Sequence, residues 1–457
     1  MRRLPLSLCA AALLLSGCSL APTYVRPEAP VPEQWPTGAA YPAPAEGEAG
    51  LPWRSLVANE KLRSVIGRML ENNRDLRASL ANVAAARAQY RGDRSALLPT
   101  IGASGSAAVT GGRNDSADSY SASVGISAFE IDLFGRLRNQ ASAQLETYLS
   151  TESGMRASRL SLVQETATAY ATLAADEDLL GIARDTAESA RRTVALNQSL
   201  FDAGLGNAVD LENAKTLLAQ AESDLAAATT QVAQDRNALN LLVGAPVEEA
   251  LLPASLAEID GTIAVPPAGL SSTVLLRRPD VVEAEHALKS ANYSIGAARA
   301  AFFPTISLTA AFGFASSALS ELFKGGSSGW SVTPSAELPL VGGSRGADVD
   351  YAEAERDRYA ALYEKAVQTA FRDVADALAR HGTIAAQRDA QGRLVAAAQR
   401  SLSLSEEQYR AGTLGFIDVL TAQRTLYSAR QTEVAATLAD IGNRFALYGA
   451  IGADDTL

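Results

Sequence analysis

Long stretches of the chain repeat small or apolar residues every three or four positions, the period of a helix that packs on other helices. Residues 211–242 carry this spacing as in a coiled-coil seam, and within residues 416–451 apolar residues recur every seven positions. Residues 62–96, 135–201 and 348–409 show the same helical period. The sequence therefore predicts very long helices, and the one ending near Phe201 approaches roughly 100 Å at 1.5 Å per residue.

Four shorter stretches alternate with a period of two instead. In each, apolar or aromatic residues alternate with Gly, Ser or Thr over about ten residues, a pattern typical of a membrane β-barrel strand. In the second stretch the alternation changes parity at Phe129, where we expect the strand to leave the membrane. The four predicted strands are residues 100–110, 119–133, 305–315 and 329–341.

The two halves of the chain follow the same order of elements. Gly204 returns as Gly412 and Gly244 as Gly452, each 208 residues later, and both copies read as a tight glycine turn before a long helix. The chain is therefore an internal tandem repeat. We divide it into a first repeat over residues 59–245, a proline-rich connector over 246–270, a second repeat over 271–452 and a tail over 453–457.

The N-terminus carries an export signal. Residues 1–17 combine two arginines with a short apolar run, which predicts a secretory signal peptide. The run ends in a lipobox-like sequence before Cys18, so we expect Cys18 to be acylated, with palmitate among its acyl chains. Ser19 follows, whereas Asp at that position usually retains lipoproteins at the inner membrane. An ordinary signal peptide with an incidental cysteine is the alternative. Residues 18–58, rich in Pro, Glu and Ala, predict an extended tether.

Composition restricts the function. The net charge of −11 becomes more negative when the signal peptide with its two arginines is removed, which argues against nucleic acid as a partner. The chain has two histidines, His286 and His381, and neither has partner ligands nearby in the sequence. We predict no enzyme activity, no catalytic residues, no cofactor and no metal site. Gly204-Leu205-Gly206 is interpreted as a helix turn, because no strand precedes it and the third glycine of a nucleotide loop is missing.

Four strands cannot form a membrane barrel alone. Single-chain barrels use at least about eight strands, and open strand edges are not tolerated in lipid. The pattern therefore predicts a homo-oligomer, and three copies give a twelve-stranded barrel. The helices lack lipid-type apolar runs and are expected to continue the barrel as an α-helical tube in the periplasm.

The chain resembles the TolC-like outer-membrane efflux channels, in the lipoprotein branch that partners RND (resistance-nodulation-division) pumps. The resemblance covers residues 18–452 and implies a homotrimer with a mixed α and β fold. It also implies an open outer-membrane barrel and a periplasmic tunnel closed at its tip, which opens on an adaptor protein and an inner-membrane pump. Its most specific marks are Leu275-Leu276-Arg277-Arg278-Pro279-Asp280-Val281, Phe302-Phe303-Pro304-Thr305-Ile306-Ser307-Leu308 and Ala422-Gln423-Arg424.

The resemblance assigns roles at the turn of the second repeat. Ile417 and Thr421 match the constriction residues of the family, with Asp418 beside them. The family often has Asp where this chain has Thr421, and whether Asp418 replaces that acidic ring stays open. We expect both turns to contact the adaptor, a simple helix hairpin being the alternative. The expected contact residues are Gly204, Leu205, Gly206, Gly412, Leu414 and Phe416.

The sequence thus predicts a passive outer-membrane conduit that exports small molecules such as drugs or other toxic compounds. A type I secretion conduit is the alternative within transport. A structural coiled-coil lipoprotein that braces the envelope is the alternative from another class, and the four alternating stretches count against it.

Overall fold

A computed structural model describes residues 19–42, 52–111, 116–264, 271–341 and 343–452. The signal peptide, Cys18 and the C-terminal tail lie outside the described residues. The chain forms two compact units, each assembled from three separate parts of the sequence. The first unit comprises residues 1–29, 81–153 and 282–365, and the second comprises residues 30–80, 154–281 and 366–457.

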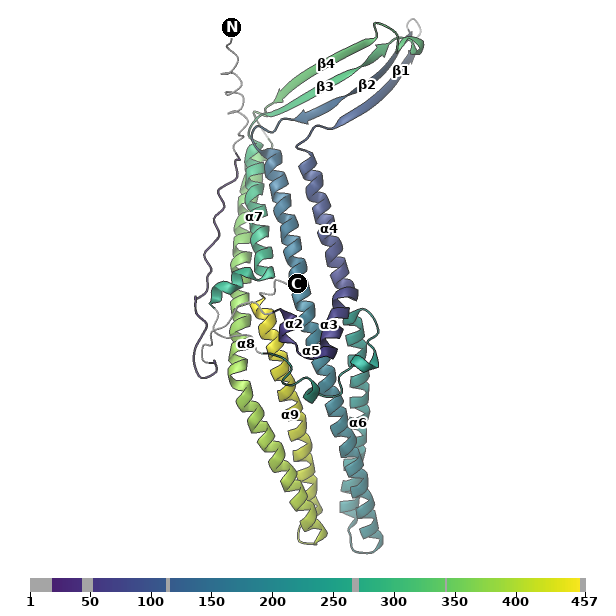
Figure 1. Cartoon of the computed structure of the whole chain (residues 1–457), viewed down its shortest axis with the longest axis vertical. Coiled ribbons are helices and arrows are strands. Elements are labelled where there is room, and N and C mark those ends of the chain that lie inside the picture. Colours follow the sequence, from purple (N-terminus) through teal and green to yellow (C-terminus); the bar gives the residue numbers. More distant parts are fainter. Residues whose placement is uncertain (1–18, 43–51, 112–115, 265–270, 342, 453–457) are drawn as a thin grey trace. The chain divides into compact units, whose positions relative to one another are not determined.

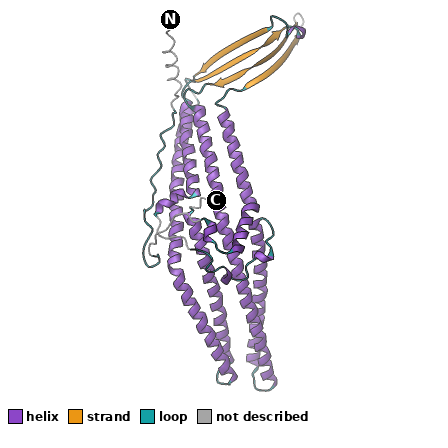
Figure 2. Cartoon of the chain, viewed as in Figure 1, coloured by secondary structure: helices purple, strands orange, loops and turns teal. Residues whose placement is uncertain are grey.

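The first unit contains one four-stranded sheet. Its strands are antiparallel neighbours in the order β1-β2-β3-β4 (Figures 1 and 2). All four predicted strands are present, but the second ends at Glu130 instead of 133, and the fourth ends at Glu337 instead of 341. The strands are β1 (Ile101–Gly111), β2 (Ser116–Glu130), β3 (Thr305–Ser316) and β4 (Ser328–Glu337).

The register of the sheet separates its two faces by chemistry. Hydroxyl groups meet across strands on one face, where Ser104 and Ser123 are 3.0 Å apart and Ser106 and Ser121 are 2.7 Å apart. On the other face Val124 is paired with Ala103 and Phe312. Because side chains alternate along a strand, one register places every serine of this set on one face and the apolar residues on the other.

A β-bulge in β2 explains the change of parity in the sequence. The pairing of β2 with β3 shifts between Ile126 and Phe129, and Ala128 has a positive φ of 46°. The backbone N–H of Ala128 donates to the Thr309 hydroxyl at 3.1 Å. Beyond the bulge Phe129 is paired with Leu308, so the apolar residues stay on the same face. The parity change in the sequence is thus a bulge in the strand pairing, and the exit of the strand from the membrane at this point stays a prediction.

The helices have the lengths that the periodicity predicts, with one correction. The stretch 62–96 is interrupted at Asn73, whose side chain accepts a hydrogen bond from the Leu76 N–H at 2.8 Å and donates to the Leu242 carbonyl at 2.7 Å. Asn is a strong N-cap, so it starts a new helix. None of the described helices is long and apolar enough to cross a membrane. The helices are α2 (Trp53–Leu56), α3 (Glu60–Asn72), α4 (Arg74–Ser95), α5 (Arg136–Asp202), α6 (Ala208–Val243), α7 (Pro279–Ala300), α8 (Arg345–Arg410) and α9 (Phe416–Ile451).

The second unit has an extensive apolar core. It gathers side chains from α3, α5, α6 and α9 together with the connector between the repeats. Gly244 ends α6 with φ 75° and lies so close to the Asn72 carbonyl that a Cβ would stand 2.5 Å from its oxygen. Tyr170, Phe445, Leu62, Ile66 and Met69 are fully buried in this core.

Residues 19–29 are extended, as predicted for the tether, but they pack along the first unit. The Asn292 amide donates to the Pro22 carbonyl at 2.7 Å. Arg26 and Tyr24 both bond the buried carboxylate of Glu285, at 2.5 and 3.2 Å. Burial alone would raise the pKa of Glu285, but the hydrogen bonds from Arg26 and Lys289 outweigh it and lower that pKa. These contacts hold the segment to the helices.

Residues 30–42 pack along the second unit in the same way. Trp35 stacks on Phe371 with ring centroids 5.0 Å apart, and the Ser272 hydroxyl donates to the Pro32 carbonyl at 2.7 Å. The short helix α2 also lies within the range 18–58 that the sequence assigned to the tether. Residues 30–42 are extended, as expected of the tether, and Trp35 packs them on Phe371. Within the described part of this range, only α2 departs from an extended tether, because the buried Trp53 supplies apolar area for packing.

The two faces of the sheet make the first prediction. We expect Val124→Arg to destabilise the protein in lipid vesicles by about 2–4 kcal/mol, because it places a charge at mid-bilayer depth on the apolar face. Ser123→Arg is the matched control, and it should cost only about 1 kcal/mol through the lost Ser104 contact. Urea unfolding in vesicles measures both. Equal costs for the two variants would contradict the assignment of faces.

Candidate functional site: the turns of the two long hairpins

The first turn joins α5 to α6 and closes with a Schellman motif. The Leu205 N–H donates to the Leu200 carbonyl at 2.8 Å, and Gly204 has φ 73°. A left-handed residue at this position is usually glycine, because other residues suffer a Cβ clash. A Cβ at Gly206 would stand 3.1 Å from the Leu200 Cβ and the Phe201 nitrogen, so a side chain there would crowd the turn.

The second turn joins α8 to α9 with the same geometry. Gly412 has φ 74°, and the Thr413 N–H donates to the Gln408 carbonyl at 3.0 Å. The Thr413 hydroxyl adds a second bond to that carbonyl at 3.1 Å. The sequence duplication thus reproduces one turn geometry twice.

The two turns differ in how the next helix begins. Asn207 caps α6, accepting from the Asp210 N–H at 2.8 Å and donating to the Asp210 carboxylate at 2.7 Å. The corresponding residue before α9 is Gly415, which has no side chain to offer. Asp418 therefore keeps an exposed carboxylate in the first turn of α9, where the helix dipole favours negative charge.

The three gate candidates lie together on α9. Ile417 is 60% exposed, and Asp418 follows it on the exposed surface. One helical turn later, the Thr421 hydroxyl donates to the Ile417 carbonyl at 2.8 Å. This part of the chain therefore presents an apolar side chain and a carboxylate side by side.

The expected exposure of Phe416 is wrong. Its side chain is only 2% exposed and packs in an apolar cluster that joins the α5–α6 hairpin to α9. Leu414 is half-buried, whereas Leu205 is 79% exposed. Val209, the repeat equivalent of Ile417, is 68% exposed and extends the apolar surface of the first tip. The cluster consists of Ala187, Ala190, Ala214, Leu217, Ala221, Phe416, Val419 and Leu420.

Tyr409 ties the two hairpins together, and sequence reasoning missed it. Its hydroxyl donates to the amide oxygen of the buried Asn197 at 2.9 Å, and its ring contacts Phe416 with centroids 5.5 Å apart. Burial, and then the charge of Asp210, raise the pKa of Tyr409. The phenol therefore stays protonated and remains a donor. Asn197 lies inside the long helix α5, twelve residues after Asp185. No local sequence pattern distinguishes it from the other polar residues of that helix.

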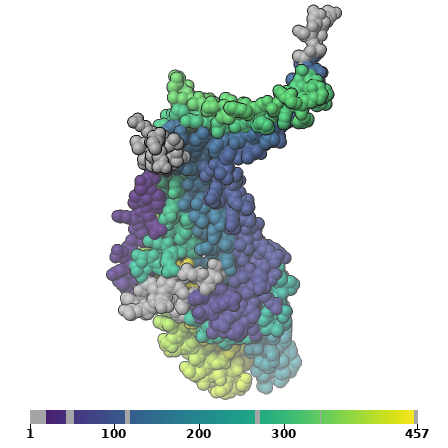
Figure 3. All heavy atoms as spheres, turned by 45° about the horizontal axis from the view of Figure 1, so that its top comes forward, coloured from purple at the N-terminus to yellow at the C-terminus, as the bar shows by residue number. Residues whose placement is uncertain are grey.

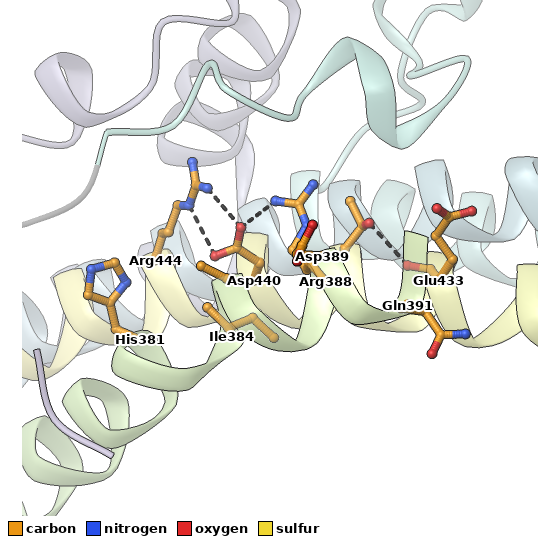
Figure 4. A pocket seen from close by; sticks show the side chains of 10 residues that line it. His381, Ile384, Arg388, Asp389, Gln391, Glu433, Asp440 and Arg444 are labelled. Atoms are coloured by element: carbon orange, nitrogen blue, oxygen red, sulfur yellow. Dashed lines mark hydrogen bonds and ion pairs between the residues drawn. The ribbon is translucent and has the colours of Figure 1, made fainter. Parts of the chain in front are cut away.

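A cavity of about 460 Å³ lies between α8 and α9, and ion-paired side chains line its polar side. Figure 4 shows Arg388 and Arg444 both directed at Asp440, at 2.6 and 2.8 Å. Arg388 also bonds Asp260 of the connector at 2.6 Å. Burial acts to raise the pKa of Asp260, but Arg388 and Arg444 outweigh it and lower that pKa. We assign this cluster to holding the connector on α8 and α9.

The histidines take part in packing contacts or line a cavity. His286 Nδ1 lies 2.6 Å from the Glu146 carboxylate on α5. His381 lines the cavity of Figure 4. Among the described residues, no group of three His, Cys, Asp or Glu side chains is arranged to hold a metal ion.

The comparison with protein families decides which class of protein these elements make. A family model described as "Outer membrane efflux protein" matches residues 65–245 and again residues 270–453. The chain belongs to the outer membrane efflux protein family. It is an outer-membrane channel of efflux systems and extends into the periplasm.

Individual relatives agree with this family. The chain is 41% identical over 465 residues to the toluene efflux pump outer membrane protein TtgC of Pseudomonas putida, covering 98% of this chain and 95% of TtgC. It is 39% identical to the cation efflux system protein CusC of Escherichia coli O157:H7, covering 96% of each. The open-state structure of the MtrE outer membrane channel of Neisseria gonorrhoeae matches with a TM-score of 0.87 at 34% identity, covering 96% of this chain and 99% of MtrE. These relatives favour efflux over the secretion and brace alternatives.

The tie between the hairpins makes the second prediction. Tyr409→Phe leaves the buried Asn197 oxygen without this donor, which costs about 1–3 kcal/mol in the state that contains the contact. We therefore expect the hairpins of the efflux channel to separate more readily and its single-channel conductance to rise. Tyr170→Phe is the matched control, because it removes a 3.0 Å bond to the Leu251 carbonyl far from the turns in sequence. A conductance increase for both variants, or for neither, would argue against the tie.

The exposed pair at the start of α9 makes the third prediction. Ile417→Ala should raise conductance, because a smaller apolar side chain obstructs ions less by dewetting. Asp418→Asn should reduce the preference for cations with little change in folding. The controls are Val209→Ala and Asp210→Asn in the first repeat, whose Asp210 is already held by Asn207. Reversal potentials in a planar bilayer measure selectivity, and wild-type values for both α9 variants would place the constriction elsewhere.

Proposed function

We propose that three copies of this chain form a passive conduit for small molecules in a tripartite efflux system. The observation that supports this most strongly is the four-stranded sheet with one apolar face and two open edges, β1 and β4. Open edges leave backbone N–H and C=O groups unpaired, and lipid supplies no partners for them. Pairing β1 of one copy with β4 of the next closes twelve strands into a barrel, which is wide enough for a lumen.

The helices form the periplasmic part of this conduit. Three copies of Ile417 would surround the axis as an apolar ring, with three Asp418 carboxylates beside them. Thr421 lies next to this ring and Asp418 supplies its acidic charge. Near the turns, the described contacts that join the hairpins of one protomer are those of Tyr409 with Asn197 and of the Phe416 cluster. A periplasmic adaptor that binds the tips more tightly in the parted arrangement would therefore open them.

The adaptor surface consists of the exposed residues of the two turns. Leu205 and Val209 present the largest apolar area on the first tip, with Leu414 half-exposed on the second. Gly204, Gly206 and Gly412 shape the turns, and Phe416 supports them from inside. The adaptor in turn connects the channel to an inner-membrane pump of the RND class. The chain itself catalyses nothing in this scheme.

The exported compound is a small molecule whose class the pump selects. TtgC is named for toluene efflux and CusC for cation efflux, yet the chain is about as similar to one as to the other. Similar channel walls thus serve different cargoes, which favours selection outside the channel.

Lipidation of Cys18 completes the proposal. The described chain begins at Ser19, whose hydroxyl lies 2.8 Å from the Asn139 amide oxygen in the first unit. Ala21 lies against Gly296, where a Cβ would stand 2.8 Å from the Ala21 Cα. The residues that follow the acylated cysteine are therefore fixed to helices, which would hold an anchor at a constant position.

Planar-bilayer recording with the purified protein tests the conduit. We expect discrete conductance steps, and a deletion strain should become sensitive to at least one class of toxic compound. Re-expression of the wild-type chain should restore resistance. Absence of current from correctly folded oligomer in the bilayer would contradict a channel and favour the structural brace.

The anchor makes the fourth prediction. Cys18→Ser should abolish palmitate labelling, because serine offers no thiol for acylation. With another cleavable signal peptide, the variant should still reach the outer membrane with partial function, since the strands hold it there. Fractionation of cells fed labelled palmitate measures this. Labelling of the serine variant at the wild-type level would refute lipidation at Cys18.

A further inference from the structure

The connection between β3 and β4 differs in chemistry from the one between β1 and β2. Residues 317–327 contain Leu319, Leu322 and Phe323, whereas residues 112–115 read Gly-Arg-Asn-Asp. Leu319 is 65% exposed and Phe323 is 71% exposed. A polar hairpin connection suffices to join two strands, so the apolar residues of the second connection require another explanation.

The β3–β4 connection is an ordered structure. The Ser327 hydroxyl bonds the Leu322 and Lys324 carbonyls at 2.6 and 2.8 Å, and the Ala315 N–H donates to the Ser327 carbonyl at 2.9 Å. Leu322 is buried beneath it. In the space-filling view, β3, β4 and their connection share the green colour and form a continuous surface at the top of the picture (Figure 3). Leu319 and Phe323 are therefore held outward by a folded loop.

The exposed side chains continue the apolar face of the sheet. Phe323 contacts Phe314 edge to face with centroids 5.4 Å apart, and Phe314 contacts Phe312 in the same way at 6.0 Å. Phe312 is paired in turn with Trp330, which is 77% exposed. Phe312 belongs to the face opposite the serine pairs, because it is paired with Val124. An unbroken aromatic row thus runs from the sheet onto the loop.

A charged pair stands directly beside this row. Lys324 and Glu321 form an ion pair of 2.5 Å, and both side chains are more than half exposed. Aromatic rings beside a lysine are typical of the level where a bilayer meets water, since rings occupy the interface and lysine reaches the headgroups. The connection therefore combines apolar side chains that suit the acyl chains of lipid with a lysine that suits the headgroups.

We propose that the β3–β4 connection is a lipid-binding anchor, in which Leu319 and Phe323 enter the interface of the surrounding leaflet and Lys324 faces its phosphates. The occupant is lipid because the aromatic row is continuous with the face of the sheet that lipid covers in the proposed channel. The inference rests on that proposed function. A neighbouring copy of the same loop is the competing occupant.

Depth-dependent quenching tests the anchor. The reporter is Phe323→Trp, introduced into a Trp330→Phe background. Trp35 and Trp53 also emit in this variant, and their contribution is measured in the Trp330→Phe protein alone and subtracted. The protein is reconstituted in phosphatidylcholine vesicles with or without bromine on the acyl chains. We expect brominated lipid to remove most of the added emission. Leu319→Trp is a second reporter should the first variant fail to fold, and Asn114→Trp in the polar connection is the control, which should stay bright.

Two outcomes would overturn the anchor. If brominated lipid leaves the added emission unchanged, the reporter does not contact lipid. If acrylamide also fails to quench that emission, a neighbouring protein surface covers the loop. Equal quenching of the Asn114→Trp control removes the distinction between the connections. Conductance of the same vesicles is recorded separately. Unquenched reporters in conducting vesicles refute only the anchor, whereas quenched reporters without current refute the channel and keep the anchor.

Discussion

A β-sheet in lipid cannot leave its edges unpaired, and this constraint governs the rest of the molecule. Each unpaired backbone group in the hydrocarbon region costs several kcal/mol. This chain supplies four strands and two edges, so its barrel depends on other copies. The same constraint accounts for the sorted faces of the sheet, because a barrel wall has lipid on one side and water on the other. The bulge at Ala128 preserves that sorting where the strand register shifts.

The duplicated hairpins add a second level of organisation. Gly204 and Gly412 build the same turn, yet one helix begins with Asn207 and the other with an uncapped Gly415. One carboxylate is therefore held by its neighbour while its counterpart Asp418 stays exposed. A small local difference between equivalent positions thus leaves one carboxylate held and the other exposed, as the proposed gate at the second turn requires.

The sequence predicts the regular parts of this molecule well. Periods of 3.6 and 2 locate the long helices and all four strands, and the parity change at Phe129 marks the bulge. The errors at Phe416 and in the N-terminal segment share one cause, because both depend on contacts between residues far apart in the chain. Phe416 is apolar at a turn, but only the fold brings the α5–α6 hairpin over it. The partners of Tyr24 and Tyr409 lie more than 200 residues away, so neither the packed N-terminal segment nor the tie to Asn197 has a local signal.

Native mass spectrometry of the protein released from lipid nanodiscs tests the central claim most directly. If strand edges close between copies, the folded protein leaves the nanodisc as three chains, and conditions that dissociate the complex also unfold its sheet. A single folded chain as the main species would contradict the account, because its β1 and β4 edges would then be stable without partners.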